Sequence, residues 1–253
     1  MSKRRSIYLH SPLAAFEGHE KSIDFDGVNE SMRNLSLSDL GVANAWSLMI
    51  WLKPTDTEFT VNSTIFRPVS DGDAFNAIEL DHRGDLAGDP FSVALSDSSA
   101  VYFKVYRYNN LLVGAIWQQI VVTWNGTTLQ LYKNASTVSP SSTPTDNTGT
   151  MTNTNRDIYI AAQAGGARWN GRMHSIALWS TALTAGNVTS IYNGGDGSSF
   201  DLSTIQGSSL QHWWKLGKAG DIGGDDGIGT AIDVNINSEN ITEAADAVAD
   251  SPT

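Results

Sequence analysis

The chain of 253 residues contains no cysteine. A disulfide framework and a thiolate metal site are therefore excluded, although a domain of this size is stable without cross-links. No segment approaches the roughly 20 consecutive apolar residues that a membrane-spanning helix needs. We therefore expect no membrane-spanning helix, and a stability that comes from a hydrophobic core.

Charged residues are also scarce, at 17% of the chain, and they are unevenly distributed. The formal net charge is −11, and no Lys or Arg follows Lys218, whereas acidic residues continue as far as Asp250. A nucleic-acid-binding surface needs clustered basic side chains. The charge distribution therefore argues against nucleic acid as a partner.

The N-terminal residues have little apolar continuity. A basic cluster at 3–5 resembles the start of a secretion signal, but polar residues and a proline at 10–12 interrupt the apolar stretch too early. We interpret residues 1–20 as a solvated, extended arm. A domain over residues 21–218 and an acidic, Gly- and Asp-rich extension over 219–253 follow it.

Short strand-like segments separated by turn dipeptides, such as Asp26-Gly27 and Gly165-Gly166, make up most of the remaining sequence. Long helical periodicity is absent, so the sequence predicts an all-β protein. The span 134–156 is rich in Ser, Thr and Asn and predicts a long surface loop. The predicted strands are 22–25, 47–53, 64–69, 76–81, 91–95, 101–106, 120–133 as a hairpin, 157–162 and 171–179.

The stretch WQQIVVTWNGTTLQLYKNA at 117–135 predicts a hairpin with Asn125-Gly126 as a two-residue loop. In that register Val122 pairs with Leu129. The opposite face is mostly polar, with Val121 as its one aliphatic residue. The apolar face consists of Ile120, Val122, Trp124, Leu129 and Leu131.

Two further segments indicate how the sheets are covered. SLMIWLKP at 47–54 is apolar on both alternating faces, which indicates a central strand covered on both sides. One short helix is predicted after Thr184, which can cap it, with Val188, Ile191 and Tyr192 on one side. Many antiparallel strands with a single late helix predict a two-sheet sandwich or jelly roll.

Four motifs occur in the order and spacing of laminin-G-like, concanavalin A-like jelly-roll domains, and the chain resembles that family from about Ser22 to Gly195. The resemblance implies two curved antiparallel sheets with a short helix near the end, and it implies little about function. The motifs are SIDFDGVNESM, WSLMIWLKP, WQQIVVTWNGTTLQLYKNA and IYIAAQAGGARWNGRMHSIALWSTALTAGNVTSIYNGG.

The resemblance also implies a calcium position, from which this chain departs. Similar domains usually carry an acidic pair where this chain has His174 and Ser175, and an Asp there helps to hold calcium together with an Asp-Gly, here Asp26-Gly27. Calcium prefers hard oxygen ligands over imidazole. We therefore expect no cofactor, and His174 disfavours a structural calcium.

Glucanases that share this sandwich place Glu-X-Asp-X-X-Glu on one strand, so that two carboxyl groups point into one cleft. Glu79-Leu80-Asp81 matches the beginning of that motif, but His82, Arg83 and Gly84 follow and the second Glu is missing. Retaining hydrolysis needs two carboxyl groups about 5 Å apart. We therefore interpret the segment as a strand that runs into a turn, and we expect no enzyme activity and no catalytic residues.

Sugar-binding sites combine an exposed aromatic ring with nearby polar groups. Arg168, Trp169 and Asn170, in a loop between two predicted strands, have this composition, and so do Tyr106 and Tyr108 at a strand end. In similar domains the position of Trp169 carries an aromatic side chain that packs against the next strand. For Trp169 we favour packing over sugar binding, because tryptophan is mostly buried on average.

The segment LQHWWKLGKAGDIGGDDGIGTAID lies beyond the jelly-roll motifs and predicts a returning strand, with Trp213 and Trp214 on opposite sides. It resembles segments of tailed-bacteriophage virion proteins that carry this jelly roll. That resemblance implies a virion protein assembled in the host cytoplasm, which agrees with a solvated arm at each end.

Two functions therefore remain open. The first is a non-enzymatic capsid decoration or cement protein, a homo-oligomer expected to be a trimer, bound to the major capsid protein or other virion subunits. Its attachment would use apolar side chains of the N-terminal arm. The second is a lectin-like module that binds a glycan for adhesion or host recognition. The arm residues of the first hypothesis are Ile7, Tyr8, Leu9 and Leu13.

Overall fold

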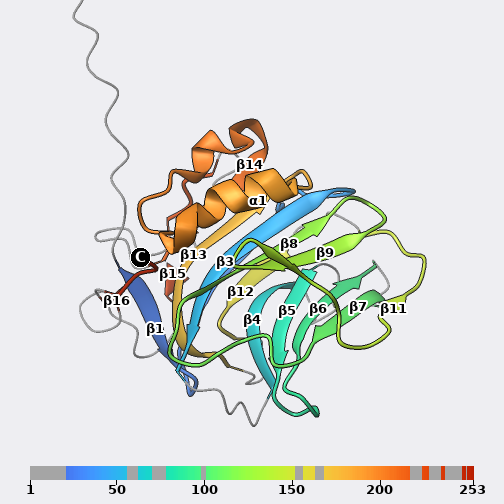
Figure 1. Cartoon of the computed structure of the whole chain (residues 1–253), viewed down its shortest axis with the longest axis horizontal. Helices are drawn as coiled ribbons and strands as arrows, with labels where there is room; N and C mark the ends of the chain where they lie inside the picture. Colours follow the sequence, from blue (N-terminus) through green and yellow to red (C-terminus); the bar gives the residue numbers. More distant parts are fainter. Residues whose placement is uncertain are drawn as a thin grey trace, which may run out of the picture.

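The strands of this protein form two antiparallel sheets packed face to face, with one helix on the outer side of one sheet (Figure 1). This arrangement confirms the predicted all-β, concanavalin A-like jelly-roll sandwich with one short helix. A computed structural model describes residues 21–55, 62–69, 78–97, 101–151, 156–162, 168–216, 224–227, 235–236, 247–248 and 250–253.

The first sheet, sheet A, consists of β1 (Ser22–Asp26), β3 (Trp46–Pro54), β8 (Gln118–Trp124), β9 (Leu129–Lys133), β10 (Ser136–Val138), β13 (Asn170–Trp179), β14 (Leu210–Lys215) and β16 (Ala247–Val248). The strand order is β10-β9-β8-β3-β13-β1-β16, and β14 also pairs with β13.

The second sheet, sheet B, consists of β2 (Met32–Ser38), β4 (Asn62–Val69), β5 (Ile78–Arg83), β6 (Phe91–Ser96), β7 (Tyr102–Tyr108), β11 (Thr145–Asp146), β12 (Arg156–Ile160) and β15 (Asn235–Ile236). The strand order is β11-β7-β6-β5-β4-β12-β2-β15, so the short strand β11 lies at one edge.

The predicted helix is present as α1 (Ala185–Tyr192) and is followed by three 3-10 turns, η1 (Asn193–Gly195), η2 (Leu202–Thr204) and η3 (Gly207–Ser209). The Thr184 hydroxyl accepts a hydrogen bond from Asn187 N at 3.2 Å, which confirms the predicted N-cap. Within the described part of the chain, no helix has the length and hydropathy needed to cross a bilayer.

The main hydrophobic core lies between the sheets, and a second apolar cluster covers the outer face of sheet A beneath α1 and the 3-10 turns (Figure 1). Strand β3 contributes to both, with Leu48 and Ile50 in the main core and Met49 and Trp51 in the outer cluster. Trp51 stacks on Tyr192 of α1, with ring centroids 5.9 Å apart. The predicted burial of this strand on both sides is therefore confirmed.

Strand β14 also contributes to both clusters. Trp214 packs in the main core and Trp213 in the outer cluster, so the predicted opposite orientation of the two rings is confirmed. The described parts of the predicted C-terminal extension include β15, which pairs with β2, and β16, which pairs with β1. The division into arm, domain and extension stays a prediction.

The predicted register of the β8–β9 hairpin is wrong by two residues. Val122 pairs with Leu131, and Trp124 pairs with Leu129, so residues 125–128 form a four-residue loop. The Asn125 side chain explains the longer loop, because its Oδ1 accepts hydrogen bonds from Thr127 N at 3.0 Å and Thr128 N at 2.8 Å. A two-residue slip keeps every side chain on its face, so the predicted apolar face does pack in the main core.

The predicted surface loop over 134–156 is only partly correct, because it contains β10 and β11. The segment 145–147 follows the edge of β7, with Thr145 opposite Val105 and Asn147 N donating to Phe103 O at 2.8 Å. Two-residue strands carry no periodicity of their own, so the sequence could not show this pairing.

Candidate functional site

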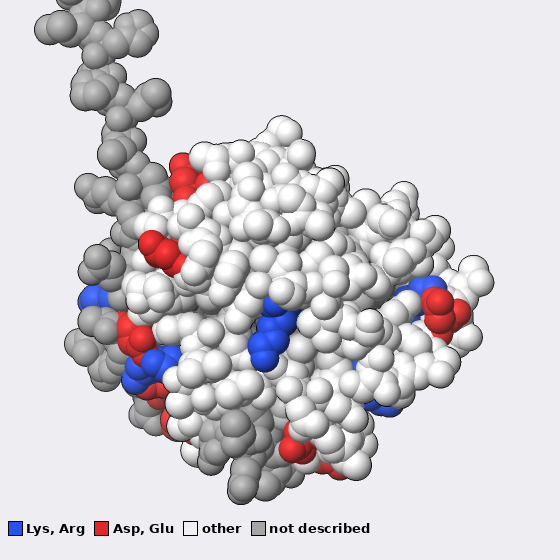
Figure 2. Space-filling view, viewed as in Figure 1, with Lys and Arg blue, Asp and Glu red and all other residues white. Residues whose placement is uncertain are grey.

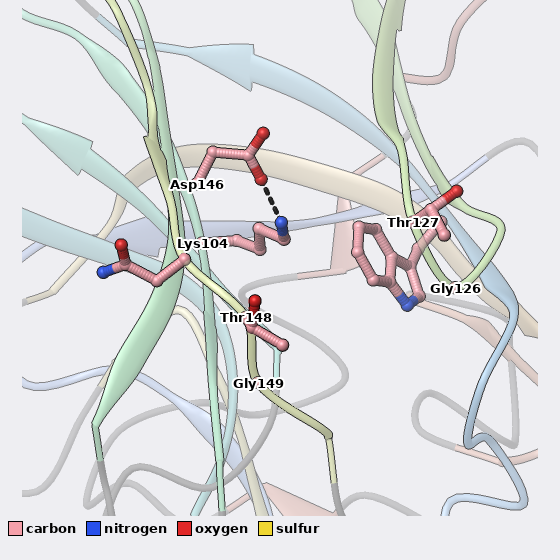
Figure 3. A pocket seen from close by; sticks show the side chains of 8 residues that line it. Lys104, Gly126, Thr127, Asp146, Thr148 and Gly149 are labelled. Carbon is pink, nitrogen blue, oxygen red and sulfur yellow. Dashed lines mark hydrogen bonds and ion pairs between the residues drawn. The ribbon is translucent and has the colours of Figure 1, made fainter.

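A pocket of about 280 Å³ opens at the edge of the sandwich, where β7 and β11 of sheet B approach the β8–β9 loop of sheet A (Figure 3). Its volume lies just below the range of about 300–1,000 Å³ typical of small-molecule sites. We call it the rim pocket. It is lined by Lys104, Trp124, Gly126, Thr127 and residues 146–149.

One wall of the rim pocket is the loop after β8. The hydrogen bonds to Asn125 Oδ1 fix this loop, and the Thr127 hydroxyl also donates to that oxygen at 2.9 Å. Gly126 has φ +94°, a backbone conformation that side-chain-bearing residues rarely adopt. The sequence therefore holds Thr127 at the pocket on a defined turn.

The opposite wall is the segment that continues β11. A Cβ added to Gly149 would lie 2.4 Å from Cγ of Phe103, so only glycine lets the backbone lie this close to the ring. Met151, just beyond, is buried in the main core and anchors the segment. The rigid sheet edge thus positions Asp146 and Thr148 across the pocket from Thr127 (Figure 3).

The floor of the rim pocket combines an aromatic ring and an ion pair. Lys104 Nζ lies 5.6 Å from the centroid of the Trp124 ring and donates a hydrogen bond to Asp146 (Figure 3). The Lys104 side chain is 11% exposed, whereas that of Asp146 is 55% exposed. The ammonium group is therefore enclosed, and the carboxylate faces the solvent side of the pocket.

Tyr106 and Tyr108, predicted as sugar contacts, are both buried in the main core. Burial, and then the negative charge of Asp146, raise the pKa of the Tyr106 phenol. Burial, followed by the effect of Tyr106, raises the pKa of Tyr108 well above its ordinary value. Neither ring lines the rim pocket.

The other predicted sugar contacts lie at a different place in the molecule, near the start of β13. Trp169 is fully buried, which agrees with the packing role. The Arg168 guanidinium donates to Glu30 O at 3.3 Å, and the exposed Asn170 pairs with Asp26 of β1. The structure therefore does not bring this group together with Tyr106 and Tyr108.

The predicted departure from a calcium site is consistent with the local contacts. His174 is fully buried and meets the Trp117 ring edge-on, with centroids 6.2 Å apart. Asp26 Oδ1 accepts hydrogen bonds from Val28 N at 2.7 Å and Asn29 N at 3.2 Å, which closes a turn. Among the described residues, no group of three or more His, Asp or Glu side chains is placed to hold a metal ion.

Glu79 and Asp81 lie on the outer face of sheet B, because they alternate along β5 with Ile78 and Leu80, which pack in the main core. The Tyr102 hydroxyl donates to Glu79 Oε2. Burial, and then the neighbouring Glu79, raise the pKa of Asp81 well above its ordinary value.

The second glutamate of the glucanase motif would fall at position 84, which is Gly84 and lies one residue beyond the end of β5. The side chain of Arg83, two residues beyond Asp81 on β5, forms two hydrogen bonds with Asp85, each 2.8 Å long. A second motif glutamate is therefore missing from β5, in agreement with the sequence.

The side chains of the rim pocket were missed by the sequence analysis. The dipeptide Asn125-Gly126 did mark the loop, but it was used only to predict a fold. Lys104, Asp146 and Thr148 come from segments whose proximity depends on the pairing of β11 with β7. Sequence spacing gives no signal for that pairing.

The N-terminal arm residues of the capsid hypothesis lie outside the described residues. Attachment to a virion, its capsid partner and a homo-oligomeric state therefore stay predictions. On the face shown in Figure 2, the described Lys and Arg side chains are separated by uncharged surface and form no continuous basic patch. The arm residues concerned are Ile7, Tyr8, Leu9 and Leu13.

Comparisons with known proteins agree with this architecture. A heptameric SAP-like pentraxin from Limulus polyphemus is 14% identical, with 68% of this chain and 82% of that chain covered and a TM-score of 0.51. A putative carbohydrate binding protein from Bacteroides ovatus is also 14% identical, with 88% of this chain and 61% of that chain covered and a TM-score of 0.55. This chain thus spans less than two thirds of the Bacteroides protein, and at these identities the similarity shows the fold alone.

A search of curated proteins finds no match. Residues 29–189, more than half of the chain, match the family described as the concanavalin A-like lectin/glucanases superfamily. The chain belongs to that superfamily.

Proposed function

We propose that this protein is a non-catalytic, lectin-like module that binds a glycan in the rim pocket. The observation that carries the proposal is the composition of the pocket. Two threonine hydroxyls and a carboxylate converge there on a rigid sheet edge, beside the Trp124 side chain, which is 4% exposed. The hydroxyls of a sugar need hydrogen-bond partners of this kind, held in fixed positions.

Two further observations support binding over catalysis. The superfamily description names lectins as well as glucanases, and the Bacteroides ovatus protein of similar fold is named as a putative carbohydrate binding protein. The glucanase motif also ends after Asp81, since Gly84 stands at the position of its second glutamate. A retaining glycosidase needs two carboxyl groups in separate roles, one as nucleophile and one as acid.

The test is a glycan array followed by titration of each positive glycan, with pocket-blocking variants. Thr148 is exposed and lines the pocket, so Thr148→Tyr should fill the pocket without disturbing the core. We expect affinity to fall about tenfold or more, the factor that corresponds to about 1.4 kcal/mol. Thr150→Tyr is the matched control, because Thr150 is also exposed but does not line the pocket.

Two results would contradict the proposal. The first is a wild-type protein that binds no glycan of a broad panel at millimolar concentration. The second is equal binding by the wild type and both tyrosine variants, which would place the glycan site elsewhere on the molecule. Release of new reducing ends from the same glycans would contradict the absence of catalysis.

A further inference from the structure

The rim pocket contains one positive and one negative side chain, and they are not equally accessible. Lys104 projects from β7 toward the Trp124 ring of sheet A, and its ammonium group is bonded to Asp146. The exposed fractions of the two side chains are 11% for Lys104 and 55% for Asp146. A ligand that enters the pocket therefore meets the carboxylate first.

This arrangement determines which charges the pocket accepts. An anionic group would approach the exposed carboxylate, while the enclosed ammonium is already neutralised by its partner, and like-charge contacts are strongly unfavourable in a binding site. A cationic group would lie next to Lys104 and compete with it for the same carboxylate. A hydroxyl group avoids both costs, because it donates to Asp146 and also exchanges hydrogen bonds with Thr127 and Thr148.

From the paired and unequally exposed charges of Lys104 and Asp146, we infer that the rim pocket selects neutral sugars and rejects sugars that carry a carboxylate or a sulfate. The inference rests on the proposed glycan binding at this pocket. Asp146 is then the residue that determines specificity, since it hides the positive charge of Lys104 from an acidic ligand.

The backbone supports this role for Asp146. Asp146 lies opposite Lys104 in the pairing of β11 with β7, so strand pairing as well as the side-chain contact holds the ion pair. The close contact of Gly149 with Phe103 fixes the segment that follows. The carboxylate therefore stays over the ammonium group when a ligand enters.

The experiment measures binding to matched pairs of glycans that differ only in charge, such as glucose and glucuronate or galactose and galacturonate units. The wild-type protein should bind the neutral member of a pair. Asp146→Asn keeps the hydrogen-bonding shape and leaves the ammonium of Lys104 without a counter-charge. It should raise the ratio of acidic to neutral binding by about tenfold or more.

Two controls isolate the charge effect. The double variant Lys104→Met/Asp146→Asn has no charge in the pocket and should return to the neutral preference. Asp85→Asn removes a carboxylate from an ion pair outside the pocket and should leave the ratio unchanged. The acidic binding gained by Asp146→Asn should weaken as salt is raised from 0.01 to about 1 M, because screening acts on the new attraction.

The outcomes separate the two proposals. Equal binding of acidic and neutral members by the wild type, or an unchanged ratio in Asp146→Asn, would overturn the inference while leaving glycan binding intact. If the wild type binds neither member of any pair, the proposed function itself fails, and the inference fails with it. Circular dichroism of each variant shows whether the sandwich is folded when binding is measured.

Discussion

Two carboxyl groups, Glu79 and Asp81, share a site on β5 where the Asp81 side chain is almost inaccessible to water. Arg67 Nη1 lies 3.6 Å from Glu79 Oε1, and the Tyr102 hydroxyl donates to Glu79 Oε2. Asp81 has the raised pKa, caused first by burial and then by Glu79. The environment of this site therefore disfavours the ionised form of Asp81.

The raised pKa of Asp81 predicts a pH-dependent stability. The contribution of a group with a raised pKa is fully present below the unfolded pKa, about 3.9 for Asp, and is lost as pH rises through the folded pKa. Asp81→Asn stays neutral at every pH. Urea unfolding should therefore show the variant to be more stable than the wild type at pH 7, by on the order of 1 kcal/mol.

The difference between Asp81→Asn and the wild type should shrink as pH falls through about 3.9 and disappear below about pH 3, where Asp81 is protonated in both the folded and the unfolded state. Asp85→Asn is the contrasting control, because Arg83 lowers the pKa of Asp85 and the pH trend is reversed. A variant that is less stable than the wild type at pH 7 would show that Asp81 is ionised in the folded protein.

At this scale the sequence predicted that Glu79 and Asp81 lie on the same face of their strand, because successive side chains of a strand alternate between its two faces. It could not predict the partners of Glu79. Arg67 comes from β4 and Tyr102 from β7, so their proximity depends on the order of strands in sheet B. The burial of Trp169 agrees with the favoured packing role, which rests on the usual burial of tryptophan and on the aromatic residue that similar domains pack there.

At the scale of elements, the β8–β9 loop shows how one side chain sets a register. Asn125 N donates to Thr128 O at 3.3 Å, and Asn125 Oδ1 accepts from the two backbone amides of Thr127 and Thr128. The two-residue loop would need positive φ at both central positions. Of Asn125 and Gly126, only Gly126 has a positive φ.

The loop geometry predicts the effect of Asn125→Ala. The substitution leaves the Thr127 and Thr128 amides without their side-chain acceptor, as at a helix whose N-cap is removed, and should cost about 1 kcal/mol. Thr128→Ala keeps every backbone group and should change stability by less than about 0.5 kcal/mol. Urea midpoints of the two variants provide the comparison, and equal midpoints would show that the Asn125 side chain does not hold the loop.

Elements with their own periodicity were predictable, and short edge elements were not. The apolar character of β3, β8 and β13 and the cap and stripe of α1 are visible in the sequence, and all four elements form where they were predicted, although the register of β8 with β9 differs. β10 and β11 have three and two residues and owe their conformation to neighbouring strands. Because β11 forms a wall of the rim pocket, the sequence predicted neither that strand nor the candidate site.

At the scale of the whole molecule, the C-terminal residues return to sheet A near the start of the fold. β16 pairs with β1, and Ser198 N donates to Pro252 O at 3.3 Å. Beyond Lys218 the sequence reads as an acidic, solvated extension, since local composition contains no apolar stripe. Its attachment depends on basic residues of distant strands, which no local pattern shows.

Asp250 is the centre of this attachment. Its carboxylate accepts hydrogen bonds from Lys53 Nζ of β3 at 2.7 Å, from Trp117 Nε1 at 3.0 Å and from Arg172 Nη1 of β13. Burial alone would raise the pKa of Asp250, but the hydrogen bonds from Lys53, Trp117 and Arg172 outweigh it and hold the pKa below its ordinary value. One carboxylate thus connects the C-terminal residues to two central strands.

The lowered pKa predicts that the contribution of Asp250 is present above the unfolded pKa of about 3.9 and is lost as pH falls through the folded value. Asp250→Asn should cost about 1 kcal/mol at pH 7, since partly exposed ion pairs are screened by solvent. The cost should shrink toward pH 3 and in about 1 M salt.

Hydrogen exchange gives the local measurement, because loosening of the C-terminal residues should accelerate exchange in β1 and β16 while the centre of β3 stays protected. A double-mutant cycle with Lys53→Met then measures the coupling of this pair. Unchanged exchange in β1 and β16, together with zero coupling, would mean that strand pairing alone holds the C-terminal residues on sheet A.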